Sequence, residues 1–169
     1  VLVPTTDFTI SGTTLTFVSV PESGAKIVAR ITNTVDYEND TSVEGGSSTG
    51  VYITKKVSLA NASTALDVRV AASVRTSSSI KTYYRVSGGE ETRRIEDIEF
   101  TPFNSDGSPD NTVDPSTGDV VLDNNFKDYK FSESGIQDFT SFQIKIVFNG
   151  TNSALPARLK DFRTIALAI

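Results

Sequence analysis

The sequence predicts an all-β fold, either a sandwich or a barrel. Ser and Thr supply 41 of the 169 residues, and residues that favour helices are sparse. Residues with β-branched or aromatic side chains recur in short runs, and clusters of Gly, Ser, Asn, Asp and Pro separate these runs. Strand-forming runs divided by turn clusters are typical of sandwiches and barrels. The length suits one domain, with or without an appendage.

A β-hairpin is predicted at the N-terminus. Residues 7–10 and 14–18 alternate polar and apolar side chains, and Ser11-Gly12 between them suits a tight hairpin turn. Residues 26–32 predict a further strand. We therefore expect residues 1–35 to form an N-terminal β-hairpin segment or the end of a preceding domain. Because the chain begins Val-Leu-Val-Pro without Met, we expect a fragment or a processed product.

Residues 36–50 predict a flexible linker or loop, since they hold three Gly and almost no apolar side chains. Residues 51–169 then form the main β domain. Its predicted strands cover residues 51–54, 57–59, 66–70, 80–86, 95–100, 128–131, 142–148 and 162–169. Residues 88–91 predict a turn, and residues 156–160 one helical turn. Residues 104–125 are the least strand-like, with a short strand expected only at 120–122.

The composition excludes much chemistry. The chain has no Cys, His, Trp or Met, so it offers no disulfide, no zinc–thiolate site and no histidine general base. We predict that it is not an enzyme. A carboxylate-based glycoside hydrolase is the remaining catalytic alternative, because its chemistry requires no His. Its candidate residues are Glu90, Glu91, Glu96, Asp97, Glu99 and Glu133, all expected at turns or on solvent-facing strand positions.

The charge and hydropathy patterns exclude two kinds of partner. The net charge is −5, and no basic cluster is longer than two residues; Arg93-Arg94 is one, with acidic residues close on both sides. Nucleic-acid binding normally requires a basic patch. No apolar run approaches the roughly 20 residues that span a bilayer. We therefore expect neither nucleic-acid binding nor membrane insertion.

The segment 104–125 contains the candidate metal ligands. It holds five Asp and no Lys or Arg, and Asp106 and Asp110 lie close together on a predicted loop. Calcium prefers such oxygen ligands, although the late Glu of an EF-hand is missing. Asp and Asn are also common turn residues, so the main expectation is a solvated loop with no cofactor.

Tyr83 and Tyr84 are the candidate ligand-binding residues. Adjacent residues on a strand point to opposite faces, so we expect one ring in the core and the other facing solvent, where it could contact a sugar. Near the C-terminus, Asp161 and Arg163 are spaced to share one face. Here we expect an ion pair that protects a sheet edge from strand addition.

Two segments resemble structural proteins of tailed-bacteriophage virions. Residues 51–86, VYITKKVSLANASTALDVRVAASVRTSSSIKTYYRV, are similar to a strand pattern of these proteins. Residues 142–168, FQIKIVFNGTNSALPARLKDFRTIALA, resemble their C-terminal pattern. The N-terminal DFTISGTTLTFVSVPESGAKI also resembles short hairpins of phage tail fibres. Together these segments cover about half of the chain, and none is a catalytic motif.

This resemblance implies a non-catalytic module of a tail, baseplate or fibre. The implied fold is an antiparallel β-sandwich, jelly-roll-like, with residues 1–35 as its β-hairpin appendage. The implied partners are sister subunits, with a trimer favoured, and neighbouring virion proteins, which the loops at 36–50 and 104–125 would contact. The module would be made in the bacterial cytoplasm and end in the virion. The alternative is a carbohydrate-binding module that contacts a glycan of the host surface.

Overall fold

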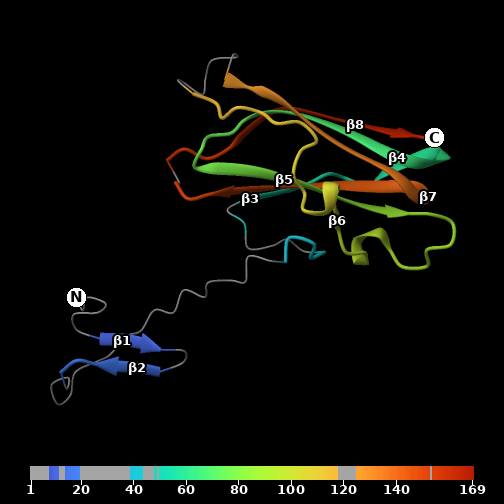
Figure 1. The fold of residues 1–169 in the computed structure, drawn as a ribbon. Helices are drawn as coiled ribbons and strands as arrows, with labels where there is room; N and C mark the ends of the chain where they lie inside the picture. Colours follow the sequence, from blue (N-terminus) through green and yellow to red (C-terminus); the bar gives the residue numbers. More distant parts are fainter. Residues whose placement is uncertain are drawn as a thin grey trace. The chain divides into compact units, whose positions relative to one another are not determined.

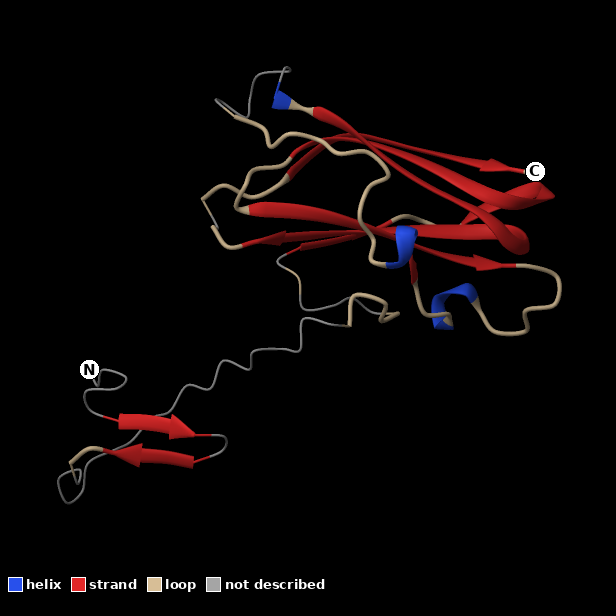
Figure 2. Cartoon of the chain, viewed as in Figure 1, coloured by secondary structure: helices blue, strands red, loops and turns tan. Residues whose placement is uncertain are grey.

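The computed structural model describes residues 8–11, 14–19, 39–43, 48, 50–117, 125–152 and 154–169. The chain divides into two compact units, Val1–Asn33 and Thr34–Ile169. Regular structure is almost entirely β-strand, and helix is confined to short turns (Figures 1 and 2). In these ranges no helix has the length and apolar character needed to cross a membrane. The predicted all-β class is confirmed.

The first unit contains an antiparallel hairpin. Strand β1 (Phe8–Ser11) pairs with β2 (Thr14–Phe17), so that Phe8 lies opposite Phe17. The short link between the strands agrees with the prediction made from the alternating residues on either side of Ser11-Gly12. The strand predicted at residues 26–32 lies outside the described residues.

The second unit is built on one open antiparallel sheet. Its strands follow the order β6-β5-β7-β4-β8, and β3 also pairs with β7. Two 3₁₀ turns, η1 and η2, flank the short strand β6. The elements are β3 (Gly50–Ile53), β4 (Val57–Ser73), β5 (Ser78–Ser87), η1 (Ile95–Asp97), β6 (Thr101–Pro102), η2 (Phe103–Ser105), β7 (Lys127–Gly150) and β8 (Arg158–Leu167).

Strand β7 runs through both halves of the sheet. Its first part pairs with β4, and its last part, from Ser141 to Gly150, pairs with β5. Figure 1 shows the orange ribbon of β7 running to the right and then back along the other half of the sheet. Gly135, at a φ of +73°, lies between Ser134, which pairs with β4, and Ser141, where the pairing with β5 begins. The bend brings the two halves of one sheet over a shared core.

The core lies between these two halves. Alternate β4 side chains, among them Val68 and Val70, are fully buried beside Phe131 of β7. Ile144 and Ile146 of the returning part of β7 belong to the same apolar cluster. Removal of these side chains from water is the main favourable term in folding. The alternation predicted for residues 66–70 is confirmed as a strand with one buried face.

Two pairs of predicted strands are continuous in the structure. Residues 57–59 and 66–70 both belong to β4, and residues 128–131 and 142–148 both belong to β7. Most of the intervening residues are polar or small, with Ile136 and Phe139 as exceptions, but they pair with each other across irregular registers between Ser58 and Ala65. Backbone pairing between strands maintains the extended conformation there, and a side-chain pattern does not reveal such pairing.

The strand predicted at residues 95–100 is wrong. Residues 95–97 form η1, and residues 98–100 belong to no strand. Ile95 and Phe100 are buried, at 2% exposure each, and Phe100 packs with Tyr83 and Val147. The apolar spacing that resembled a strand therefore reflects a segment that covers the face of the sheet opposite the main core.

The helical turn predicted at residues 156–160 is also wrong. Arg158 and Leu159 already belong to β8 and lie opposite Ser73 and Ala72 of β4. A register irregularity follows at Ala71. The turn predicted at 88–91 is present, since Glu91 N–H donates to the Gly88 carbonyl at 3.2 Å.

Gly88 provides a stability prediction. A Cβ at this position would lie 2.2 Å from the backbone oxygen of Asp138, so the backbone would have to shift. We expect Gly88→Ala to lower the free energy of unfolding by about 1–3 kcal/mol, measured by urea denaturation. Gly89→Ala is the matched control, because a Cβ there meets nothing within 4 Å. Equal stabilities of the two variants would contradict the close approach.

Candidate functional site

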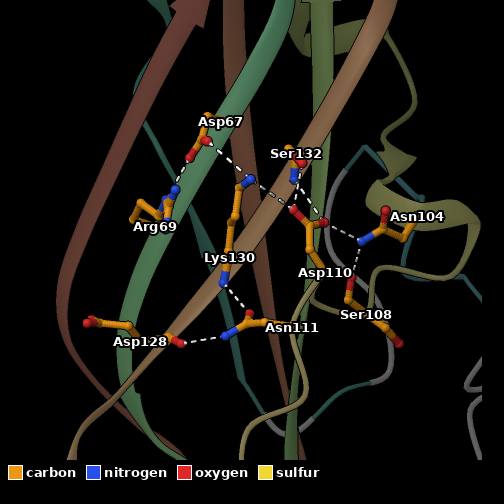
Figure 3. Close-up of polar contacts among 9 residues, drawn as sticks. All are labelled: Asp67, Arg69, Asn104, Ser108, Asp110, Asn111, Asp128, Lys130 and Ser132. Carbon is orange, nitrogen blue, oxygen red and sulfur yellow. Dashed lines mark hydrogen bonds and ion pairs between the residues drawn. The ribbon is translucent and has the colours of Figure 1, made fainter.

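The outer face of β4, β7 and β8 carries a network of charged side chains (Figure 3). Asp67 accepts a hydrogen bond from Arg69 Nε at 2.9 Å and lies 3.9 Å from Lys130 Nζ. The register places Arg69 between Lys130 of β7 and Arg163 of β8. Three cations therefore occupy neighbouring positions across the strands, and like charges placed so repel one another unless they are neutralised.

Each of these cations has an acidic partner. Lys130 lies 3.8 Å from Asp110, and Arg163 donates to Asp161 at 2.7 Å. The predicted Asp161–Arg163 ion pair is confirmed, and it lies on β8 at the end of the strand order. The Asp161 carboxylate also accepts the Phe162 backbone N–H at 2.9 Å. This bond occupies a donor that strand addition would require, which agrees with a protective role at the edge.

Asp110 fastens the loop after η2 to β7. Its carboxylate accepts hydrogen bonds from Ser132 Oγ at 2.6 Å, from Ser132 N–H at 3.1 Å and from Asn104 Nδ2 at 2.7 Å (Figure 3). Asn111 extends the attachment through Asp128 O and Lys130 N–H. Burial raises the pKa of Asp110, but the bonds from Ser132 and Asn104 outweigh burial and lower the pKa overall.

The two candidate calcium ligands have separate partners. Asp106 accepts hydrogen bonds from Ser108 N–H at 2.9 Å and Ser108 Oγ at 2.7 Å, within its own turn. Asp110 turns to β7. Within the ranges that the structure describes, no three Asp, Glu, His or Cys side chains gather as a metal-binding group. Calcium at this loop stays a prediction.

The attachment by Asp110 can be tested by substitution. Asp110→Ala removes three hydrogen bonds, so we expect the free energy of unfolding to fall by about 1–3 kcal/mol at pH 7. Because folding lowers the pKa of Asp110, its contribution is present at neutral pH and is lost as the pH falls through that lowered value. Urea unfolding at pH 7 and at pH 3 measures both effects. Asp106→Ala is the control, expected to change stability by less than about 0.5 kcal/mol.

The opposite face of the sheet, near β5 and the end of β7, holds a buried polar cluster around Phe100. Lys145 is fully buried, and its Nζ donates to the backbone oxygens of Asp40 at 2.5 Å and Ser42 at 3.1 Å. Nζ also lies 5.1 Å from the centre of the Phe100 ring. Residues 39–43, which belong to the predicted linker, therefore contact the sheet of the second unit, and Phe100 N–H donates to Thr41 O.

Arg85 completes this cluster from β5. Its guanidinium lies 4.3 Å from the Phe100 ring centre, and Nε donates to Gln143 Oε1 at 2.9 Å. Its Nη1 donates to the backbone oxygens of Glu96 and Ile98. Burial lowers the pKa of Arg85, and the nearby acidic residues oppose this shift. The sheet face that alternation assigned to polar side chains is thus covered by other segments of the chain.

Both candidate tyrosines are buried. They point to opposite faces as predicted, since Tyr84 belongs to the main core cluster and Tyr83 to the cluster with Phe100. The expectation that one ring faces solvent is wrong, because Tyr83 is 5% and Tyr84 9% exposed. Segment 95–100 and residues 39–43 cover the second face, so neither ring offers an exposed platform for a sugar.

Burial of Tyr83 predicts how the free energy of unfolding changes at alkaline pH. Burial, the charge of Asp40 and a hydrogen bond to its carboxylate raise the pKa of Tyr83 to about 12. Its hydroxyl is therefore harder to ionise in the folded chain. The contribution of this neutral hydroxyl to the free energy of unfolding is complete below pH 10. It falls as the pH rises toward 12, by about 2–3 kcal/mol in all. We expect Tyr83→Phe to show a shallower loss of stability in urea unfolding between pH 9 and 11.5, and an unchanged slope would contradict this.

Two of the carboxylates considered for hydrolysis form ion pairs with nearby arginines. Glu91 forms an ion pair with Arg93 at 2.8 Å, and Glu96 lies 3.6 Å from Arg94. A cavity of about 630 Å³ opens between the end of β7 and the start of β8. Its described lining is apolar or uncharged and includes Phe148, Asn149, Pro156, Ala157 and Leu159. Comparison of the chain with family models, curated proteins and solved structures found no match.

Proposed function

We propose that this chain is a non-catalytic structural module that assembles with sister subunits and neighbouring proteins in the virion of a tailed bacteriophage. The virion assignment, and with it the localisation, rests on the resemblance of residues 51–86 and 142–168. The structural support for assembly is the distribution of exposed apolar side chains. We further propose that the bent sheet is a sandwich of the jelly-roll kind, with the two halves as its layers.

The apolar side chains gather at the borders of the sheet. Eight large apolar side chains are exposed among the described residues, and six of them lie on β3, at the start of β4, or on β8 and the C-terminus. These six are Val51, Tyr52, Val57, Ile165, Leu167 and Ile169. Tyr52 of β3 contacts Phe162 of β8 edge-to-face, with ring centres 6.3 Å apart, so the two borders meet. Grouped exposed apolar residues are typical of protein interaction surfaces.

Self-assembly is tested by the mass in solution. We expect light scattering over a wide concentration range to show a closed oligomer, with a trimer favoured, because homo-oligomers are normally symmetric. Replacing Ile165 and Leu167 with Lys should lower the mass to that of a monomer. Val18→Lys is the matched control, because Val18 is also exposed but lies on the first unit. A monomer at every concentration would contradict self-assembly.

The polar outer face favours a second candidate, a module that binds a glycan of the host surface. Arg69 is 53% exposed and lies beside Asp67 and Lys130, so these side chains offer hydrogen-bond donors and acceptors to sugar hydroxyls. A glycan array with the wild type and Arg69→Ala tests this candidate. Saccharide binding that the substitution abolishes would support it, and a lack of binding to any glycan would count against it.

A further inference from the structure

We propose that β3 of one copy of this chain adds as an antiparallel strand to residues 164–167 of β8 in the next copy. This inference rests on the self-assembly proposed above and names the sheet edges that carry it. In the part of the chain that the structure describes, β3 pairs with β7 alone and β8 with β4 alone, so each strand has one open edge. An open edge presents a row of backbone N–H and C=O groups, which an added extended strand can pair.

The hydrogen bonding of Thr54 indicates which backbone groups of β3 face its open edge. Thr54 N–H donates to the carbonyl of Ile144 on β7 at 2.9 Å. Because the hydrogen-bonding groups of successive residues alternate between the two sides of a strand, those of Val51 and Ile53 point away from β7. The strand reads Gly-Val-Tyr-Ile, so no charge of its own protects this edge.

The open edge of β8 differs between its two halves. In the first half, the Asp161 carboxylate occupies the Phe162 N–H at 2.9 Å. In the second half, residues 164–167 read Thr-Ile-Ala-Leu and carry no charge. By the same alternation, the N–H groups of Thr164 and Ala166 point to the same side as that of Phe162, away from β4. The second half is therefore the part of β8 that can accept a strand.

One antiparallel register pairs the two edges completely. Val51 then exchanges backbone hydrogen bonds with Ala166 of the next copy. Ile53 exchanges them with Thr164 of that copy. Both pairs fit at once, because the outward groups are two residues apart on each strand, which is the repeat of hydrogen-bonded pairs in an antiparallel ladder.

The same register brings exposed apolar side chains together. Tyr52, 46% exposed, lies opposite Ile165 of the next copy, 53% exposed, at a non-hydrogen-bonded position, where side chains approach most closely. Aromatic and β-branched residues form favourable cross-strand pairs. Leu167, 41% exposed, lies opposite Gly50, which has no side chain to obstruct it. Strand addition thus covers apolar surface as well as backbone groups.

Contact between two different edges also suits the favoured trimer. A strand that pairs with its own copy across a two-fold axis gives a dimer, whereas a contact between different surfaces closes a ring. Tyr52 of β3 and Phe162 of β8 have ring centres 6.3 Å apart, so both edges belong to one border of the second unit. Each copy can therefore donate β3 to one neighbour and accept a strand on β8 from the other.

The test is disulfide cross-linking of the full chain between introduced cysteines. The sequence has no Cys, so every disulfide must come from the introduced pair. The variant with Tyr52→Cys and Ile165→Cys is oxidised with copper–phenanthroline and analysed on a non-reducing denaturing gel. Directly opposed Cβ atoms of antiparallel strands lie about 4.5–5.5 Å apart, close to the range that a disulfide spans. We expect covalent multimers up to three times the mass of the chain, which reduction converts to single chains.

Two further variants complete the experiment. Val18→Cys combined with Ile165→Cys is the matched control and should remain a single chain on the gel, because Val18 is also exposed but belongs to the first unit. Gly50→Cys combined with Leu167→Cys tests the same register if the first variant does not assemble under reducing conditions. A Cβ at Gly50 meets Phe148 at an ordinary contact distance of 3.7 Å.

The outcomes separate this inference from self-assembly itself. A wild-type oligomer in light scattering, with no cross-link between chains for either cysteine pair, would overturn the strand addition and leave self-assembly standing. A wild type that is monomeric at every concentration would overturn both. Cross-linking of Tyr52→Cys alone would show β3 paired with β3 of another copy, and this result would also contradict the inference.

Discussion

Replacing Arg85 with Ala is expected to lower the free energy of unfolding by about 3–5 kcal/mol. Arg85 is 4% exposed, and its guanidinium donates to one side-chain oxygen and two backbone oxygens while it lies over the Phe100 ring. The substitution leaves Gln143 Oε1 and the oxygens of Glu96 and Ile98 without this donor, and buried acceptors without donors are costly. Urea unfolding at pH 7 gives the difference in stability.

Two variants separate burial of Arg85 from its charge. Arg85→Lys keeps the charge but not the planar set of donors, so we expect an intermediate loss of about 1–3 kcal/mol. Arg69→Ala removes an exposed arginine from the neighbouring part of the sheet and should cost less than about 1 kcal/mol. A loss for Arg85→Ala as small as that for Arg69→Ala would show that segment 95–100 does not bury the guanidinium.

Replacing Phe103 with Ala is expected to cost about 3–5 kcal/mol. Phe103 is fully buried although it belongs to η2, outside the main strands. Its ring packs edge-to-face on Tyr84, with centres 4.9 Å apart, and lies 6.2 Å from Phe131. These two rings come from the two halves of the sheet, so the substitution leaves a cavity between them.

The control for Phe103 is an apolar residue of similar chemistry at the surface. Leu155→Ala removes a side chain that is 42% exposed, so we expect a change of less than about 0.5 kcal/mol. Thermal and urea unfolding of both variants measure the difference. A Phe103→Ala variant as stable as Leu155→Ala would indicate that η2 does not pack against the core.

Side-chain alternation located most of the strands because it reports which residues can face a core. The pattern at 66–70 and 142–148 matches buried positions of β4 and β7, and the hairpin at the N-terminus was predicted with its short link. It failed at 95–100, since Ile98 and Phe100 are spaced like strand residues, but Phe100 packs on the sheet from a segment outside it. Spacing along the chain does not distinguish a strand from a segment that crosses one.

The candidate site was predicted only in part. Asp106 and Asp110 were identified as loop carboxylates, but their attachment to different partners depends on how the loop meets β7. Lys145 and Arg85 were missed as buried groups, because an alternating strand with charged positions resembles a strand with one solvated face. The signal in the sequence was the apolar content of segment 95–100, because these apolar side chains need a second surface on which to pack.

By itself, the sequence determined the all-β class, the positions of most strands, the chemistry excluded by the missing Cys and His, and the ion pair of Asp161 and Arg163. Those properties depend on residue type and on spacing within a few residues. Only the tertiary structure decided that β7 serves both halves of the sheet and that Tyr83 and Lys145 are buried. Burial of the second face depends on segments distant in sequence, and their packing free energy appears only once the sheet has formed.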